Sequence, residues 1–180
     1  NPGDIMFISG ESGSAKTKFN MRKTFQLLEN NHKKVSVFWN TFEDSKEDII
    51  DMYLSSKIMA TKKEIQGKSK NKISETQLMK MEETIERIQC FDIVFNEQKL
   101  TIPEIRKRFI GFCNKRTDRY CICIIDNIML LREHRLKMEQ TKIDDLISAE
   151  LKDTIDASKL ITKSSLVLLH HFNSDYVNKN

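Results

Sequence analysis

Five short apolar runs alternate with longer stretches of helical periodicity along this chain. The runs are nearly continuously apolar, as expected for strands that are buried on both faces of a sheet. They lie at Asp4–Ser9, Val35–Trp39, Phe91–Phe95, Tyr120–Asp126 and Ser165–His170. The connections between them are long enough to hold a helix, which parallel strands require. The alternation therefore predicts an α/β fold, a mostly parallel sheet flanked by helices on both faces.

The stretches between the runs carry apolar residues every three or four positions, which places them on one face of a helix. The predicted helices are Lys16–Glu29, Lys46–Met59, Glu75–Gln89, Ile102–Asn114 and Thr141–Ser158. The third begins with a capping box formed by Ser74 and Gln77. The fourth begins with a second capping box, formed by Thr101 and Glu104.

A glycine-containing loop joins the first predicted strand to the first predicted helix. It consists of Gly10, Glu11, Ser12, Gly13, Ser14, Ala15, Lys16 and Thr17. The loop fits the phosphate-binding pattern G-x-x-x-x-G-K-[ST], except that Ala15 replaces the second glycine. Backbone amides and the helix dipole favour an anion here, and ligands of such sheets bind at the carboxyl ends of the strands. The loop predicts a nucleoside triphosphate ligand, and a flexible Gly/Ser turn is the alternative.

Three side chains of this loop have specific expectations. Lys16 would reach the β- and γ-phosphates, and the Thr17 hydroxyl would ligate Mg²⁺. Ala15 adds a methyl group, which costs roughly 1–2 kcal/mol if its backbone must be left-handed. If Ala15 instead only lies close to phosphate, the cost is some affinity. The sequence leaves both possibilities open.

Two acidic residues complete the predicted site. The apolar run Tyr120–Asp126 ends in a carboxylate, as a Walker B strand does, and Asp126 would hold Mg²⁺ through its water shell. In many ATPases a second acid follows, but here that residue is Asn127. Glu43, shortly after the second strand, is the candidate for orienting the attacking water. Alternatively, Glu43 is an acid that the dipole favours near a helix start.

Composition narrows the class of protein. The chain has 180 residues, 39% apolar and 31% charged, which predicts one soluble globular domain. Its net charge of +4 is compatible with nucleic-acid binding without arguing for it. No signal peptide or run of 18 apolar residues is present, so we expect a cytoplasmic protein without a membrane span. Because the chain starts at Asn1 without a methionine, we expect a fragment of a longer protein.

Two further features have ordinary interpretations. The four cysteines, Cys90, Cys113, Cys121 and Cys123, lack C-x-x-C spacing and are expected to be buried, reduced thiols. The lysine-rich stretch Thr61–Lys72 has no aromatic residues for stacking on single-stranded nucleic acid. A solvated connection is therefore the better interpretation of that stretch.

Four segments resemble, in order, motifs of DnaB-type replicative helicases. Thr41–Leu54 resembles the stretch with the catalytic glutamate, Leu100–Arg106 the "LTPxEVR" helix start, Ile124–Leu130 the "IIDYLQL" Walker B segment, and Leu168–Asn173 "ALSQLNR". The resemblance spans nearly the whole chain. It implies a RecA-like ATPase core over residues 1–180, with ATP and Mg²⁺ as cofactors.

The resemblance also implies individual roles and partners. Glu43 stands at the position of the catalytic glutamate, and His171 at that of the glutamine that senses the γ-phosphate. Single-stranded DNA and a homo-oligomeric ring are implied partners of the full-length protein. Ala15 and His171 depart from the family pattern, with His170 in the place of a serine. His171 would still donate a hydrogen bond to phosphate, in a pH-dependent way, although both histidines fit equally well as a plain strand end.

Three functions compete on this evidence. The leading hypothesis is an ATP-hydrolysing motor domain of a DnaB-like DNA helicase. The second is a nucleotide-regulated binding or assembly module with little hydrolysis, which the two departures favour. The third, a small P-loop kinase, is disfavoured because the lysine-rich stretch lacks the arginines of a kinase lid. The family's arginine finger and much of its DNA-contacting region lie beyond the sensor segment.

Overall fold

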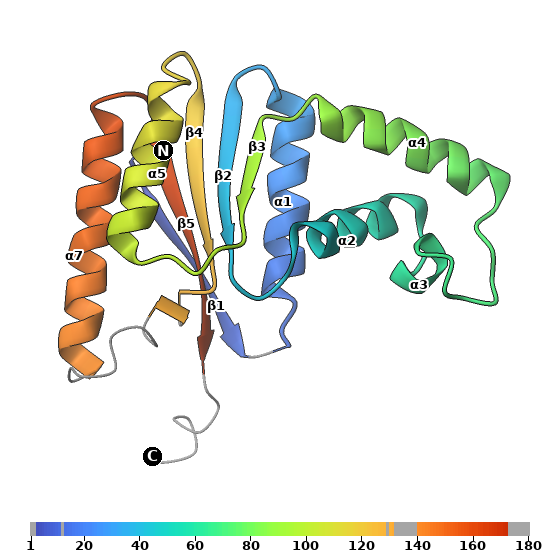
Figure 1. Ribbon diagram of the computed structural model, residues 1–180, viewed down its shortest axis with the longest axis horizontal. Coiled ribbons are helices and arrows are strands. Elements are labelled where there is room, and N and C mark those ends of the chain that lie inside the picture. Colours follow the sequence, from blue (N-terminus) through green and yellow to red (C-terminus); the bar gives the residue numbers. More distant parts are fainter. Residues whose placement is uncertain (1–2, 12, 129, 132–139, 173–180) are drawn as a thin grey trace.

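A five-stranded parallel sheet forms the centre of the molecule, in the order β1-β5-β4-β2-β3 (Figure 1). The computed structural model describes residues 3–11, 13–128, 130–131 and 140–172. The strands are β1 (Ile5–Glu11), β2 (Val35–Thr41), β3 (Ile93–Asn96), β4 (Tyr120–Asp126) and β5 (Ser164–Phe172). The predicted α/β fold with a parallel sheet is confirmed.

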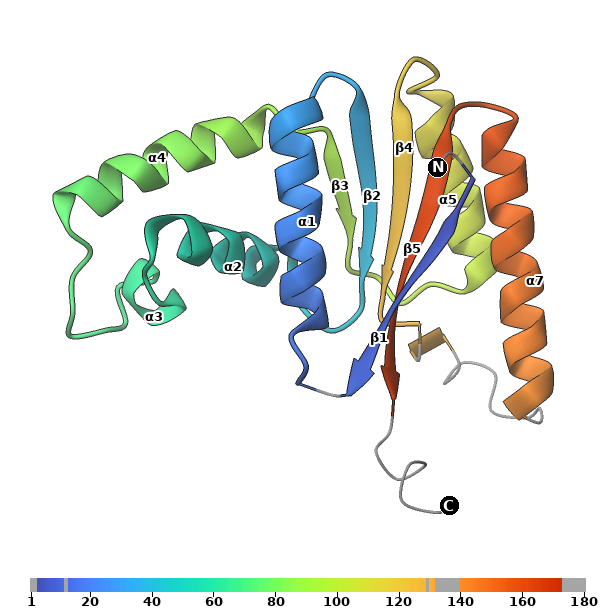
Figure 2. The same cartoon turned by 180° about the vertical axis from the view of Figure 1, so that it is seen from behind.

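Helices cover both faces of this sheet. They are α1 (Lys16–Asn31), α2 (Lys46–Ile58), α3 (Lys62–Ile65), α4 (Glu75–Gln89), α5 (Ile102–Asn114) and α7 (Gln140–Lys159). α5 and α7 pack on one face, and α1 lies on the other with α2 beside it. α2, α3 and α4 extend away from the sheet beyond α1, as the two opposite views show (Figures 1 and 2). None of the described helices is long and apolar enough to cross a membrane.

Strand β4 shows why the apolar runs are continuous. Its residues alternate between the two faces, because side chains of a strand point to opposite sides in turn. Cys121, Cys123 and Ile125 join the cluster beneath α5 and α7. Ile122 and Ile124 join the cluster beneath α1 and α2. Both faces of the strand are buried, so an alternating polar pattern would be unstable here.

The expectation of buried thiols is confirmed for Cys113, Cys121 and Cys123. It is wrong for Cys90, which follows α4 and is exposed.

Local chemistry explains where the helices begin. The side chain of Gln77 accepts a hydrogen bond from the Ser74 N–H, which confirms the capping box of α4. The predicted capping box of α5 is likewise present. The sequence interpretation missed α3, a single turn within the lysine-rich stretch. There the Glu64 carboxylate accepts a hydrogen bond from the Thr61 N–H and closes another capping box. None of the α3 residues is buried, so the stretch remains a solvated connection.

Strand β1 is longer than predicted and forms one edge of the described sheet. It pairs with β5 alone and continues to Glu11, so the phosphate-loop sequence begins inside the strand. Met6 is 58% exposed and Phe7 60% exposed, on opposite faces of β1. This strand is therefore the least covered part of the sheet.

Candidate nucleotide site

The predicted site residues gather at the carboxyl edge of the sheet. The loop after β1, the end of β4 and the turn after β2 meet there, since parallel strands all end on the same side (Figures 1 and 2). Ser12 lies outside the described residues. For the other predicted residues the structure gives a backbone position and, except at His171, a side chain.

Ala15, which replaces the second glycine, has a left-handed backbone, with φ 60° and ψ 28°. Of the two possibilities left open by the sequence, the conformational one holds. The cost for a residue with a Cβ is about 1–2 kcal/mol. Gly13 is also left-handed, with φ 77°. The loop therefore has the left-handed backbone that suits a glycine at position 15, and the alanine there is strained.

Lys16 is enclosed by the loop itself. It is 5% exposed, and its Nζ donates hydrogen bonds to the carbonyl oxygens of Gly10 at 2.8 Å and Glu11 at 2.6 Å, and to the Ser14 Oγ at 3.1 Å. Gly10 makes room for this arrangement, because a Cβ there would lie 2.7 Å from the Ser14 Oγ. All three acceptors are neutral, so the positive charge of Lys16 remains uncompensated by them. The loop thus concentrates positive charge beside the N-terminus of α1, where anions bind.

Asp126 is a buried carboxylate beside Thr17. It is 2% exposed, and neither carboxylate oxygen accepts a hydrogen bond from the described part of the chain. Burial, the largest cause, and the nearby carboxylates of Glu43 and Asp44 raise its pKa to about 7, while the Thr17 hydroxyl and Lys16 oppose the rise. Thr17 therefore lies close enough to favour the charged form without meeting hydrogen-bond geometry.

These surroundings fit a divalent cation. Mg²⁺ prefers hard oxygen ligands and is usually held through one or two protein groups and its own waters. The Asp126 oxygens, which are buried and accept no hydrogen bond from the described residues, and the hydroxyl of the partly exposed Thr17 are such groups and lie side by side. A bound cation would also restore the usual ionisation of the carboxylate.

Glu43 lies in the turn after β2, and its side chain is exposed. Its Oε1 accepts a hydrogen bond of 2.8 Å from the Nδ2 of Asn127. The N-terminus of α2 is capped by Ser45, with Asp48 completing the box. A cap of α2 therefore does not require Glu43. Its role as the water-orienting group stays a prediction, now with a location beside Asp126.

His171 lies on β5, at the same carboxyl edge of the sheet. In the register of the β1–β5 pair it stands opposite Gly10, the first residue of the phosphate loop. Its side chain lies outside the described residues, so the predicted sensor role stays a prediction. The backbone position agrees with a group next to the loop.

Asn127 is a residue of this edge to which the sequence interpretation assigned no function. It is 3% exposed and contacts Glu43, although the two residues are 84 positions apart. The available signal was its position directly after the Walker B acid. From this position the sequence interpretation concluded only that a second acid is missing. It could not predict the contact with Glu43, because that contact depends on which strands are neighbours in the sheet.

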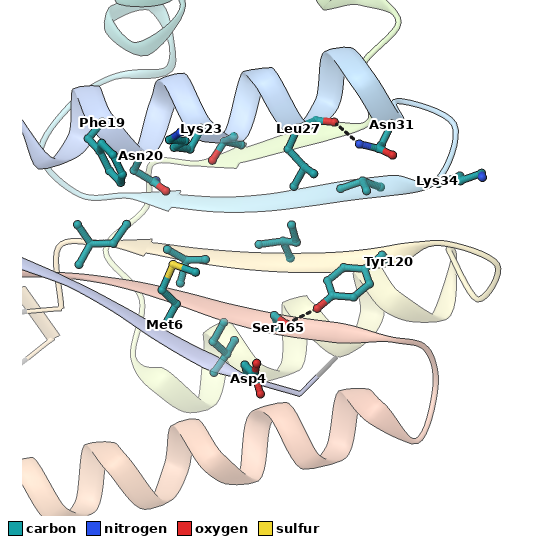
Figure 3. A pocket seen from close by; sticks show the side chains of 16 residues that line it. Asp4, Met6, Phe19, Asn20, Lys23, Leu27, Asn31, Lys34, Tyr120 and Ser165 are labelled. Carbon is teal, nitrogen blue, oxygen red and sulfur yellow. Dashed lines mark hydrogen bonds between the residues drawn. The ribbon is translucent and has the colours of Figure 1, made fainter. Parts of the chain in front are cut away.

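A separate cavity lies along α1, on the face that this helix shares with β1 and β5 (Figure 3). Its volume is about 650 Å³, and apolar side chains such as Met6, Phe19 and Leu27 line it. No residue of the phosphate loop lines this cavity, and neither Glu43 nor Asp126 does. The cavity is therefore distinct from the nucleotide site. It lies beside β1, the strand that the described helices cover least.

Comparisons with known proteins agree with this architecture. Among solved structures, the chain is similar to one described as an ATPase domain, with a TM-score of 0.83 and 17% identity over 99% of this chain and 61% of that one. It is equally similar, at 0.83 and 17%, to a DnaB-like replicative helicase solved to show its interactions with primase, over 99% of this chain and 42% of that one. At this identity the likeness shows the fold, which is RecA-like. The chain thus spans less than two thirds of either solved chain.

The sequence itself gives the family. No curated protein matches the chain. The family model described as the DnaB-like helicase C-terminal domain matches residues 1–160, which is most of its length. The chain belongs to the family of DnaB-like helicase C-terminal domains.

Proposed function

We propose that this chain is the ATP-hydrolysing motor domain of a DnaB-like DNA helicase. The observation that supports it best is the meeting of four groups at one sheet edge. Lys16 lies within the phosphate loop, and Thr17 lies beside the Asp126 carboxylate, which accepts no hydrogen bond from the described residues. Glu43 lies near Asp126 and accepts a hydrogen bond from its neighbour Asn127. A plain Gly/Ser turn would not account for a buried carboxylate that accepts no hydrogen bond from the described part of the chain.

Each group has a distinct part in this proposal. Lys16 and the loop amides bind the phosphates of ATP, and Thr17 with Asp126 hold Mg²⁺. The cation supplies charge neutralisation on the phosphate oxygens. Glu43 orients the attacking water and accepts its proton. His171, placed opposite Gly10 on β5, responds to the γ-phosphate.

The partners follow from the family. We propose that the full-length protein forms a homo-oligomeric ring and acts on single-stranded DNA, with residues 1–180 as its RecA-like core. A reducing, cytoplasmic environment is part of this proposal and suits the four free thiols.

A second function is favoured by one observation. Ala15 retains a left-handed backbone at a cost that glycine would avoid. A site under weaker selection for turnover would tolerate that cost. A nucleotide-regulated assembly module with slow hydrolysis is therefore the competing proposal.

ATP turnover by the full-length protein separates the two. We expect Mg²⁺-dependent hydrolysis that Glu43→Gln lowers by about 10²- to 10⁴-fold, the usual contribution of a general base. Glu47→Gln is the matched control, because Glu47 is exposed in the first turn of α2 and should leave turnover unchanged. Equal rates for the parent and Glu43→Gln would exclude Glu43 as the base. Tight ATP binding without turnover would favour the assembly module.

A further inference from the structure

Asn127 is held rigidly between two strands at the carboxyl edge of the sheet. On one side, the Asp126 carbonyl accepts a hydrogen bond of 2.8 Å from the Phe42 N–H, next to Glu43. On the other side, the Ile128 N–H donates to the Leu169 carbonyl at 2.9 Å. The backbone around Asn127 is thus tied to the turn after β2 and to β5 at once.

The side chain of Asn127 points at Glu43 from this fixed base. Its Nδ2 donates to the Glu43 Oε1 at 2.8 Å, and Asn127 is 3% exposed whereas Glu43 is exposed. A buried, fixed donor therefore meets the carboxylate of an exposed side chain. Such a contact selects one orientation of the carboxylate.

The chemistry of the amide suits the charges nearby. Glu43 stands close enough to Asp126 and Asp44 to disfavour their ionisation, so repulsion acts on the glutamate as well. An amide N–H offsets this repulsion at Oε1. An ionised carboxylate at position 127 has no proton to donate, and it would add a further negative charge. The asparagine after the Walker B acid thus donates a hydrogen bond to Glu43, whereas a second acid at that position would repel the glutamate.

We propose that Asn127 is a positioning residue that holds the Glu43 carboxylate in the orientation for hydrolysis. The inference rests on the proposed function, because it assigns Glu43 the role of the base. It predicts that Asn127 affects the chemical step and not the affinity for ATP, since the phosphate loop binds the nucleotide. It also predicts that the effect of Asn127 passes through Glu43.

The test uses Asn127→Ala and the near-isosteric Asn127→Asp in the full-length protein. We expect kcat to fall about tenfold to a hundredfold in both variants, as for a misplaced catalytic group, while the neutral Asn127→Ala leaves the dissociation constant for ATP unchanged. In the Glu43→Ala background, either Asn127 substitution should cause no further loss of residual turnover. Ser158→Ala is the control, because Ser158 is fully buried and hydrogen-bonded to Ser164 far from this edge. It should lower the melting temperature without changing kcat.

The outcomes distinguish this inference from the function on which it rests. If Glu43→Ala stops turnover while both Asn127 variants hydrolyse ATP at the parental rate or faster, the inference is wrong and the function stands. A loss that persists in the Glu43→Ala background, or a loss in Asn127→Ala that is matched by weaker ATP binding, also contradicts positioning. A parent that binds ATP without turnover overturns both.

Discussion

Asp92 and Asp126 lie at opposite ends of the same sheet and have opposite surroundings. Asp92 precedes β3, and the Arg116 guanidinium donates to both of its oxygens, at 2.6 and 2.7 Å. Ser36 donates a further hydrogen bond of 2.6 Å. These contacts, Arg116 first, hold the pKa of Asp92 below its usual value. Asp126, at the end of β4, accepts none within the described chain, and burial raises its pKa to about 7.

The difference separates a carboxylate that is paired within the fold from one that accepts no hydrogen bond from the described residues. A paired carboxylate contributes to the stability of the fold in its charged form. A buried charge without a partner costs stability, and such costs persist where a ligand compensates for them. In the proposed function, a cation and a nucleotide at the carboxyl edge compensate for this cost, whereas Asp92 at the amino edge already has its partners in the fold.

Exchanging each carboxylate for an amide is the strongest test of the comparison. Asp126→Asn should lower Mg²⁺-dependent ATP turnover by about 10²- to 10³-fold, because metal catalysis contributes several kcal/mol. The same change should raise the melting temperature at pH 8 without nucleotide, since it removes an unpaired buried charge. Steady-state kinetics and thermal unfolding measure the two effects.

Asp92→Asn is the matched control for that exchange. It removes the charge from a paired site, so the free energy of unfolding should fall by about 2 kcal/mol while turnover is unchanged. If both substitutions shift stability in the same direction, the contrast between the two edges is wrong.

The two carboxylates should also respond to pH in opposite ways. The folded-state pKa of Asp126 lies above its unfolded value, so the nucleotide-free protein should lose stability as pH rises from about 4 through about 7. The loss is on the order of a few kcal/mol. Asp92 has a lowered pKa, so its contribution is present above its unfolded pKa near 3.8 and disappears only as pH falls through the folded value.

Urea unfolding between pH 5 and pH 8 measures this difference. The free energy of unfolding of the parent minus that of Asp126→Asn isolates the contribution of Asp126 from other titrating groups. A difference that stays constant over this range would contradict the raised pKa.

The smallest expected effect concerns the strain at Ala15. Ala15→Gly should stabilise the nucleotide-free protein by up to about 1 kcal/mol, because the relief of the left-handed penalty exceeds the entropy cost of glycine. Ala149→Gly, on an exposed position of α7, should destabilise by about 1 kcal/mol. Chemical unfolding measures both. If Ala15→Gly lowers the free energy of unfolding as Ala149→Gly does, the backbone at Ala15 is not strained.

The fold was predictable because burial on both faces leaves a strong pattern. The continuous apolar run of β4 and the periodicity of the helices required no tertiary information. The turn α3 was missed because the surrounding lysines outweighed the Thr61–Glu64 capping signal. The conformation of Ala15 was left open because an alanine can adopt a left-handed backbone at a modest cost. Whether it does so depends on the conformation of the whole loop.

The candidate site was only partly predictable for a different reason. Lys16, Thr17 and Asp126 belong to patterns with fixed spacing, so the sequence located them. The contact between Asn127 and Glu43 depends on β4 and β2 being neighbours in the sheet. Neighbouring strands are not marked in a single sequence, and a hydrogen bond between their ends follows only from the assembled sheet.

The exposed position of β1 has a practical consequence for handling the protein. An outermost strand with open backbone groups and apolar side chains on both faces is a template for pairing between molecules. Met6 and Phe7 give β1 both apolar faces. Self-association of the isolated 180-residue chain at high concentration would therefore reflect this edge, and should not be taken as evidence for a ring.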